Sequence, residues 1–440
     1  MHAAKVLWQS MVWRGLYYIS AFVINIVIAR HFEAAVSGAV YYLGSIYALI
    51  LLVSSLSLES GIIYFAAKKE IPATRLFNFS IVWSLFTGLM SFLIIFYFFY
   101  EDHPFIPKTL LLYSSVLYIS GNLLITYCSG FFYADNNFKI PSIVIIAGTL
   151  ILVILIPYGG RSIVPAINNE NYFYVYFGSY FVQGLCLAIA TKLKYIQGSL
   201  LQFLSRAEYK MLLRYCGLAF TGNLIFFLLY RIDYFFVEKY CTADELGNYI
   251  QVSKLVHLFF ILPTILASAV FPMTAGGHKE KIHILLTLLS RTIFFVYLLI
   301  TAVLAITGSW LFPFVFGESF TAMYQPFLFL IPGILALSGI FTVTAYFAGR
   351  NQIGINITGS LLALVVILIG DIFFVPAYGI NAAAMISSMG YIVYQVYIIF
   401  VFRKEYPCSV ANFFIFRRSD WKQIRHSVSL LRNKENENKQ

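Results

Sequence analysis

Two charged residues, Arg231 and Asp233, stand inside an otherwise apolar and aromatic stretch, "LLYRIDYFFVEKY" at 228–240. An ionisable side chain near the centre of a membrane span costs about 2.5 to 3.5 kcal/mol on insertion scales, so it is expected to face a partner or a wet cavity. Residues two apart on a helix point about 200° away from each other, so these two do not neutralise one another. Each therefore needs polar surroundings of its own.

A third charge, Arg14, lies in the first apolar stretch, about 12 Å along a helix from its inner end. Tyr17, Tyr18, Ala21 and Asn25 follow at helical spacing, so one face carries a guanidinium, two phenols and an amide. Together with Arg231, this face provides the donors that an anionic group needs. We expect Arg14, Tyr18 and Asn25 to line a binding cavity. The alternative is an arginine that reaches the cytoplasmic interface.

Lys254 offers a partner for Asp233. It lies at a matching depth on the next, antiparallel apolar stretch, so we expect an Asp233–Lys254 ion pair. Arg231 is then left to contact substrate, and Lys254 is a second candidate for that contact. The alternative is that all three residues anchor helix ends at the interface. Glu59 and Asp371 lie near the ends of other apolar stretches and are expected to be interfacial or paired, with ion coupling as the alternative.

The sequence carries no phosphate-binding loop, no HExxH and no GxSxG motif. Its five cysteines lack CxxC spacing and its seven histidines are scattered, so neither a disulfide framework nor a metal site is expected. We therefore expect no cofactor and no catalytic residue.

The composition, 60% hydrophobic and only 11% charged over 440 residues, is that of a polytopic membrane protein rather than a soluble one. Alternating ten-residue strands are missing, so the expected fold class is all-α. About twelve segments are long and apolar enough to span a bilayer. They are 6–28, 38–62, 77–100, 108–132, 140–157, 171–191, 212–237, 248–272, 284–307, 325–348, 353–376 and 380–402.

The net charge of +11 is distributed over alternate loops, which indicates membrane orientation rather than nucleic-acid binding. Loops of one side hold Lys68, Lys69, Arg75, Lys139, Lys192, Lys194, Arg206, Lys210, Arg214, Lys279, Lys281 and Arg350, and the tail after residue 402 holds nine more basic residues. The opposite loops hold only Arg30, Lys108, Arg161 and Lys239. Both termini are therefore expected in the cytoplasm. The tail begins basic and aromatic, which indicates an interfacial segment, and ends polar, which indicates disorder.

The two halves of the chain resemble each other. Arg30 and Gly38 match Lys239 and Gly247, both 209 positions later, and "IPYGG" at 156–160 matches "VPAYGI" at 375–380. Six spans separate equivalent helices, so the repeat is parallel. We expect a six-helix lobe at 1–195, a linker at 196–211, a second six-helix lobe at 212–402 and a basic cytoplasmic tail at 403–440.

The segments "YRIDYFFVEKYCTADELGNYIQVSKLVHLFFILPTILASAVFPMTA" (230–275) and "DIFFVPAYGINAAA" (371–384) resemble the polysaccharide-unit flippases of the multidrug/oligosaccharidyl-lipid/polysaccharide (MOP) exporter superfamily. The resemblance implies alternating access in a bacterial inner membrane, with polyprenyl-diphosphate-linked oligosaccharide, such as O-antigen or capsule units, moved from the inner to the outer leaflet. It also implies partners: the glycosyltransferases, polymerase and chain-length regulator of the same pathway.

The sequence leaves three alternative functions to consider. A multidrug or cation antiporter of the same superfamily would typically place a carboxylate in the first lobe, where the first span offers Arg14. A membrane polymerase or glycosyltransferase would need large external loops, and those here are short. A scaffolding membrane protein is disfavoured by the buried charges.

Overall fold

The computed structural model describes residues 2–98, 108–135, 137–158, 169–196, 202–263, 270, 274, 282–417 and 420. Every element assigned in these residues is helical, and none is a strand. The helices are α1 (His2–Ser55), α2 (Leu58–Lys68), α3 (Ala73–Phe98), α4 (Lys108–Ala134), α5 (Lys139–Tyr158), α6 (Asn169–Tyr195), α7 (Arg206–Tyr240), α8 (Ala243–Leu258), α10 (Ile282–Phe316), η1 (Glu318–Met323), α11 (Tyr324–Gly349), α12 (Ile353–Glu405) and η2 (Val410–Phe413).

Nine helices of the described part are long and apolar enough to cross a membrane. Two of them contain a backbone break: Glu33 in α1 (φ 59°, ψ −177°) and Gly379 in α12 (φ 59°, ψ −145°). These breaks fall between the predicted spans 6–28 and 38–62 and between 353–376 and 380–402. An all-α polytopic membrane protein is thus confirmed, with two pairs of expected spans joined into long bent helices.

Two predicted spans differ in detail from the helices. The span at 38–62 is interrupted, because Leu56 and Ser57 take left-handed conformations between α1 and α2. The span at 248–272 begins within α8, which ends at Leu258, and much of its remainder lies outside the described residues.

The break at Gly379 has a simple sequence origin. Pro376, three residues earlier, has no N–H to donate to the helix, and glycine adopts positive φ without the steric cost that other residues meet. Glu33 adopts the same φ with a side chain, so this bend is the more strained of the two.

The chain divides into two compact units. Unit 1 comprises residues 1–250 and 312–322, and unit 2 comprises residues 251–311 and 323–440. The predicted lobes at 1–195 and 212–402 follow the sequence repeat and stay a prediction, since tertiary contacts group α7 and the start of α8 with the first unit.

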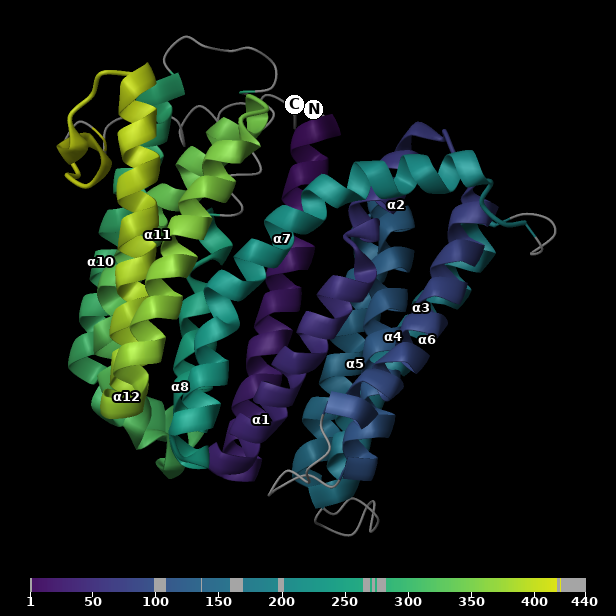
Figure 1. The fold of residues 1–440 in the computed structure, drawn as a ribbon, viewed down its shortest axis with the longest axis horizontal. Helices are drawn as coiled ribbons and strands as arrows, with labels where there is room; N and C mark the ends of the chain where they lie inside the picture. Colours follow the sequence, from purple (N-terminus) through teal and green to yellow (C-terminus); the bar gives the residue numbers. More distant parts are fainter. Residues whose placement is uncertain are drawn as a thin grey trace, which may run out of the picture. The chain divides into compact units, whose positions relative to one another are not determined.

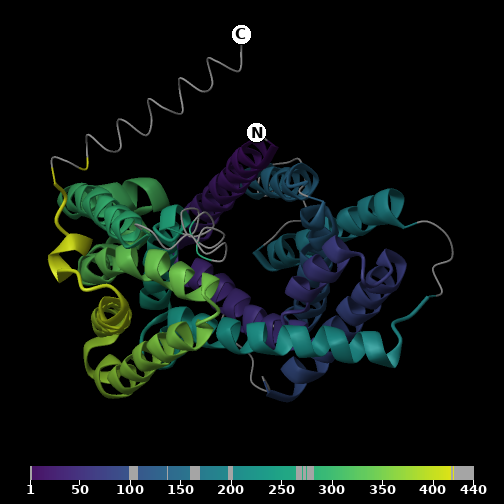
Figure 2. The same cartoon turned by 90° about the horizontal axis from the view of Figure 1, so that it is seen from above.

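Unit 1 is built around α4, which packs along both α3 and α6 (Figures 1 and 2). Gly121 of α4 faces the backbone of Tyr180 and Phe181, where an added Cβ would meet backbone atoms at 2.4 to 2.6 Å. Gly184 of α6 faces the carbonyl oxygen of Gly121 in return, with a corresponding distance of 2.7 Å. Such small residues let two membrane helices approach at van der Waals distance.

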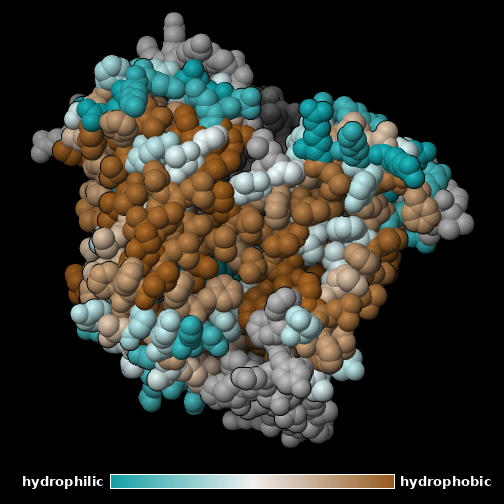
Figure 3. Space-filling view, in the orientation of Figure 1, coloured by the Kyte–Doolittle hydropathy of each residue, from teal (hydrophilic) through white to brown (hydrophobic). Residues whose placement is uncertain are grey.

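Unit 2 contains the paired helices α11 and α12, which lie side by side (Figure 1). Glycines again mark their contact: an added Cβ at Gly333 would lie 2.8 Å from Ser388 Oγ. The Ser388 hydroxyl donates to the Phe329 carbonyl at 2.6 Å. Over these helices the surface is apolar along its length and hydrophilic at the ends, as a bilayer requires (Figure 3).

Candidate functional site

Arg231 is the charged residue around which a site can be built in unit 1. A capping box of Ser205 and Glu208 starts α7, which carries Arg231 in its third quarter. The Nη1 of Arg231 donates to Ser45 Oγ on α1 at 3.0 Å, and the guanidinium lies 5.2 Å from the ring centre of Phe227. Both of these partners are uncharged, and within the described residues no ion pair joins Arg231 to a carboxylate.

Hydrogen bonds connect Arg231 to the predicted polar face of α1. The Ser45 hydroxyl accepts from Arg231 and donates to the Tyr41 carbonyl at 3.0 Å. The Tyr41 hydroxyl in turn donates to the Asn25 carbonyl at 3.2 Å. The Asn25 amide donates to the Ala21 carbonyl at 2.7 Å. Two residues singled out from the sequence, Arg231 and Asn25, are thus joined through Ser45 and Tyr41, which the sequence did not single out.

The phenols of α1 face accessible space. Tyr17 and Tyr18 keep 37% and 40% of their surface exposed, with ring centres 5.3 Å apart. Arg14 belongs to the same helix, but its side chain lies outside the described residues. Its expected role at the cavity therefore stays a prediction.

Further tyrosines from α4 and α6 extend this polar region. Tyr118 stacks edge-on against Tyr180 with ring centres 4.9 Å apart, and the hydroxyls of Tyr176 and Tyr180 lie 3.4 Å from each other. Tyr118 is within electrostatic range of Arg231, and Tyr180 is within range of Tyr17. Among 32 tyrosines nothing in the sequence sets these apart, because only the packing of α1, α4 and α6 brings them together.

Asp233 points to a different neighbour from Arg231, as their spacing on the helix predicts. It is only 4% exposed, and its carboxylate accepts hydrogen bonds from the Tyr249 hydroxyl of α8 and from the backbone N–H of Tyr234. Lys254 lies further along α8 and is half-buried. The Asp233–Lys254 pair stays a prediction, and Tyr249 is a partner that sequence reasoning missed.

The two other acidic candidates are both desolvated. Glu59 lies in the first turn of α2, and its Oε2 is buried without a hydrogen-bond partner in the described part of the chain. Tyr127 of α4 and Cys216 of α7 are its electrostatic neighbours. Asp371 of α12, in unit 2, is fully buried. Whether either carboxylate couples an ion stays a prediction.

One end of unit 1 is closed by contacts between segments from both sequence repeats. Gly38 and Gly247, the two glycines matched by the repeat, touch: a Cβ on Gly38 would lie 2.6 Å from the Gly247 Cα. Beside them, the backbone N–H of Ala34 donates to Ser319 Oγ at 3.0 Å. We call this region, defined by Arg30, Gly38, Gly247 and Ser319, the closed end.

Arg30 completes the closed end. Its Nε donates to the Val315 carbonyl at 2.8 Å and its Nη2 donates to the Phe314 carbonyl, so it caps the last turn of α10. Arg30, Pro313, Phe314, Gly317 and Glu318 line a shallow hollow of about 630 Å³ here. Capping of helix carbonyls by the Arg30 guanidinium and direct contact between two glycines join α1, α8 and α10 at the closed end.

No group of three or more His, Cys, Asp or Glu residues that suits a metal ion occurs in the described part of the chain. The candidate site therefore consists of one guanidinium, several phenols, hydroxyls and an amide.

Comparisons with solved structures identify the fold. The chain superposes on an inward-facing multidrug resistance MATE family transporter of the MOP superfamily with a TM-score of 0.71, at 13% identity, over 91% of this chain and 98% of that one. It also matches lipid II flippase MurJ (TM-score 0.69, 13% identity, 91% and 89% covered). A MOP superfamily transporter from Pyrococcus furiosus, described as having a binding pocket of reverse polarity, matches with a TM-score of 0.65 at 14% identity over 91% and 94%.

The chain has the fold of the MOP superfamily. No family model matches it, and no curated sequence matches it either. These neighbours are described as a lipid II flippase, a MOP superfamily transporter and a multidrug resistance MATE family transporter, and at 13 to 14% identity the likeness shows the fold alone.

Proposed function

We propose that this protein is a secondary transporter that moves a polyprenyl-diphosphate-linked oligosaccharide from the inner to the outer leaflet of a bacterial inner membrane. The observation that carries the proposal is Arg231, a half-buried cation that contacts the uncharged groups of Ser45 and Phe227. A half-buried guanidinium with no carboxylate ion pair among the described residues keeps its charge for an anionic ligand. A lipid-linked diphosphate supplies that anion, and the planar fork of arginine suits its oxygens.

The rest of the site fits the same ligand. The hydroxyls of Tyr17, Tyr18 and Tyr180 and the Asn25 amide are neutral donors and acceptors of the kind that sugars bind. Arg14 is the proposed second cation of this site, and the predicted contact of Lys254 with substrate stays a prediction. The polyprenyl chain would stay in lipid.

The proposed orientation places both termini, and the basic loops, in the cytoplasm. The closed end then faces outwards, so release to the outer leaflet requires Gly38 and Gly247 to separate. The partners proposed with this function are the glycosyltransferases, polymerase and chain-length regulator of the same pathway. The proposed activity is transport, not catalysis.

A second candidate function is export of cationic drugs, since one of the structural neighbours is described as a multidrug resistance MATE family transporter. Glu59 favours it, because its Oε2 is buried in unit 1 without a hydrogen-bond partner among the described residues. A desolvated carboxylate is a site at which a cation or proton can bind.

The test measures ligand binding by native mass spectrometry of the purified full chain, with undecaprenyl diphosphate and tetraphenylphosphonium as probes. Losing one charge-assisted contact typically costs about 1.5 to 3 kcal/mol, so Arg231→Gln is expected to weaken undecaprenyl diphosphate binding about 10- to 100-fold. Arg206→Gln, which removes an exposed arginine at the start of the same helix, is the matched control and is expected to bind as wild type.

The two candidate functions give opposite outcomes. In the multidrug outcome, Glu59→Gln loses tetraphenylphosphonium binding and Arg231→Gln leaves undecaprenyl diphosphate binding unchanged. That result would replace the flippase proposal with the multidrug one.

A further inference from the structure

The chain folds back on itself after its last membrane helix. α12 ends at Glu405, and the following residues pack against α10 within unit 2. Phe413 of η2 is fully buried against Phe402, with ring centres 5.8 Å apart. We call this segment, residues 406–417 together with Asp420, the C-terminal clip.

Two more rings fix the clip to α10. Phe414 meets Phe294 edge-on at 5.2 Å between ring centres, and Phe416 stacks on Phe295 at 5.0 Å with an interplanar angle of 16°. Two rings of the clip thus contact the adjacent residues Phe294 and Phe295 of one helix, which gives the clip a defined place on it.

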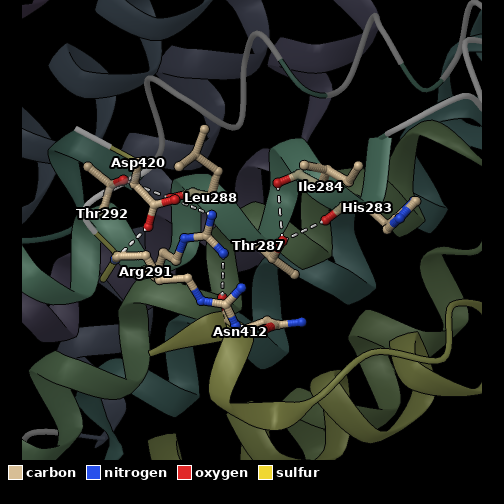
Figure 4. A network of polar contacts seen from close by, with 9 residues as sticks. His283, Ile284, Thr287, Leu288, Arg291, Thr292, Asn412 and Asp420 are labelled. Carbon is tan, nitrogen blue, oxygen red and sulfur yellow. Dashed lines mark hydrogen bonds and ion pairs between the residues drawn. The ribbon is translucent and has the colours of Figure 1, made fainter. Parts of the chain in front are cut away.

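A buried ion pair pins the far end of the clip (Figure 4). The Nη2 of Arg291 on α10 lies 2.6 Å from Asp420 Oδ1, and their side chains are 8% and 1% exposed. The other carboxylate oxygen accepts the backbone N–H of Arg417 at 2.8 Å. The Nη1 of Arg291 donates to the Asn412 carbonyl at 3.5 Å. Both carboxylate oxygens of Asp420 therefore bond to groups within the protein, and its charge is paired with Arg291.

Glu405, at the end of α12, is a second carboxylate close to the clip. It forms a partly exposed ion pair with Arg350 and accepts the Tyr346 hydroxyl at 2.6 Å. Asp420 and Glu405 are thus each paired with an arginine other than Arg403 and Arg417.

Three cations and two large apolar side chains are exposed on the clip and on the last turn of α12. Arg403, Lys404 and Arg417 are exposed, and Val410 and Ile415 expose 42% and 57% of their surface. Arg403 Nε donates to the Cys408 carbonyl at 2.7 Å, and Arg417 Nη2 donates to Asn412 Oδ1 at 2.6 Å. Both guanidinium groups are held in place by neutral acceptors that leave their charge uncompensated.

We propose that the C-terminal clip, together with Arg403 and Lys404 in the last turn of α12, is a binding surface for anionic phospholipid head groups. α12 is apolar enough to cross the bilayer, so the clip that directly follows it lies at the boundary between membrane and water. There, exposed apolar side chains enter the acyl boundary while cations meet anionic head groups. Each basic residue near an anionic leaflet adds about five-fold to affinity, so the three together add on the order of 100-fold.

The experiment counts the lipids that stay bound to the full-length protein. The protein is reconstituted in nanodiscs of phosphatidylethanolamine with one fifth phosphatidylglycerol, released, and examined by native mass spectrometry. We expect phosphatidylglycerol to be enriched on the wild type over its share in the disc. The triple variant Arg403→Gln/Lys404→Gln/Arg417→Gln is expected to lose most of this enrichment.

The matched control removes three exposed basic residues elsewhere, Lys69→Gln/Lys139→Gln/Lys192→Gln, and is expected to keep the enrichment. Equal enrichment in the wild type and the clip variant, or equal loss in both triple variants, would overturn the proposal. So would full displacement of the lipid by soluble pyrophosphate, which would make the clip a site for free diphosphate. Should the triple variant unfold, Arg417→Gln alone is expected to lower the enrichment about five-fold.

Discussion

The central residue-scale feature is that Arg231 and Asp233, two positions apart, meet different environments. Arg231 binds a hydroxyl of α1, whereas Asp233 is buried against Tyr249 and a backbone N–H. The proposed role of the arginine is therefore to contact ligand, whereas the aspartate forms hydrogen bonds inside the fold. This division of roles follows from the 200° separation that a helix imposes on such a pair.

Replacing Tyr249 tests the structural role of Asp233. Tyr249→Phe removes the hydroxyl donor and leaves a buried carboxylate with one donor fewer, which typically costs about 1 to 3 kcal/mol. We expect a lower melting temperature of the detergent-solubilised protein, with undecaprenyl diphosphate binding preserved at temperatures where it is folded. Tyr209→Phe, at an exposed phenol of the same unit, is the control. An unchanged melting temperature would show that the Asp233–Tyr249 contact does not hold α7 to α8.

The sequence predicted some of these residues and missed others for physical reasons. A charge within an apolar span is conspicuous, so Arg231, Asp233 and Glu59 could be found without a structure. Ser45, Tyr118 and Tyr249 could not, because a hydroxyl in a membrane helix is common and gains meaning only from the helix packed against it. The Asp233–Lys254 pairing was argued from depth alone, and depth does not specify the direction of a side chain.

At the scale of elements, the closed end depends on two glycines that the sequence repeat had already matched. Equivalent residues of a repeat meet each other where a pseudo-symmetry axis passes, so the contact of Gly38 with Gly247 is the structural counterpart of the sequence match. The bent helices α1 and α12 were less predictable, since only the backbone shows that paired spans continue as one helix.

Gly247→Ala tests the closed end. An added Cβ at Gly247 would lie 1.9 Å from the Ala34 carbonyl oxygen, so the helices must separate, at a cost of about 1 to 3 kcal/mol. We expect a cysteine placed at Asn25 in a cysteine-free background to react faster with an externally added, membrane-impermeant thiol reagent in this variant. Gly44→Ala, where nothing lies within 4 Å of the new Cβ, is expected to leave the rate unchanged. Equal rates in the two variants would mean that the glycine contact does not control access.

The ion pair of the C-terminal clip makes a separate prediction. Arg291→Gln leaves the Asp420 carboxylate buried without its cation, and breaking such a pair typically costs about 3 to 5 kcal/mol. We expect the clip to become sensitive to trypsin at Arg417 before the membrane helices unfold. Lys404→Gln, which alters an exposed cation that contacts Phe400 of its own helix, is expected to keep the protection. Protection retained in Arg291→Gln would show that the aromatic contacts alone hold the clip.

For the whole molecule, the orientation in the membrane decides which leaflet each end of the site faces. Cys241 lies between α7 and α8, on the side expected outside, and burial, followed by the nearby Glu245, raises the pKa of its thiol to about 11. Only the thiolate reacts, so below pH 11 labelling should speed up about ten-fold for each unit of external pH. We expect an impermeant methanethiosulfonate reagent added to intact cells to show this dependence in a variant that keeps Cys241 alone. A variant that keeps only Cys408 should stay unlabelled, and the reverse pattern would invert the proposed topology.

The most direct test of the flippase proposal is the leaflet distribution of polyprenyl-diphosphate-linked glycan in cells that lack this protein. The cells are complemented with wild type, Arg231→Ala or Arg206→Ala at matched expression. We predict that the lipid-linked glycan accumulates facing the cytoplasm in the deletion strain, and that wild type and Arg206→Ala clear it while Arg231→Ala does not. Normal filling of the outer leaflet without the protein, together with increased sensitivity to cationic drugs, would contradict the account.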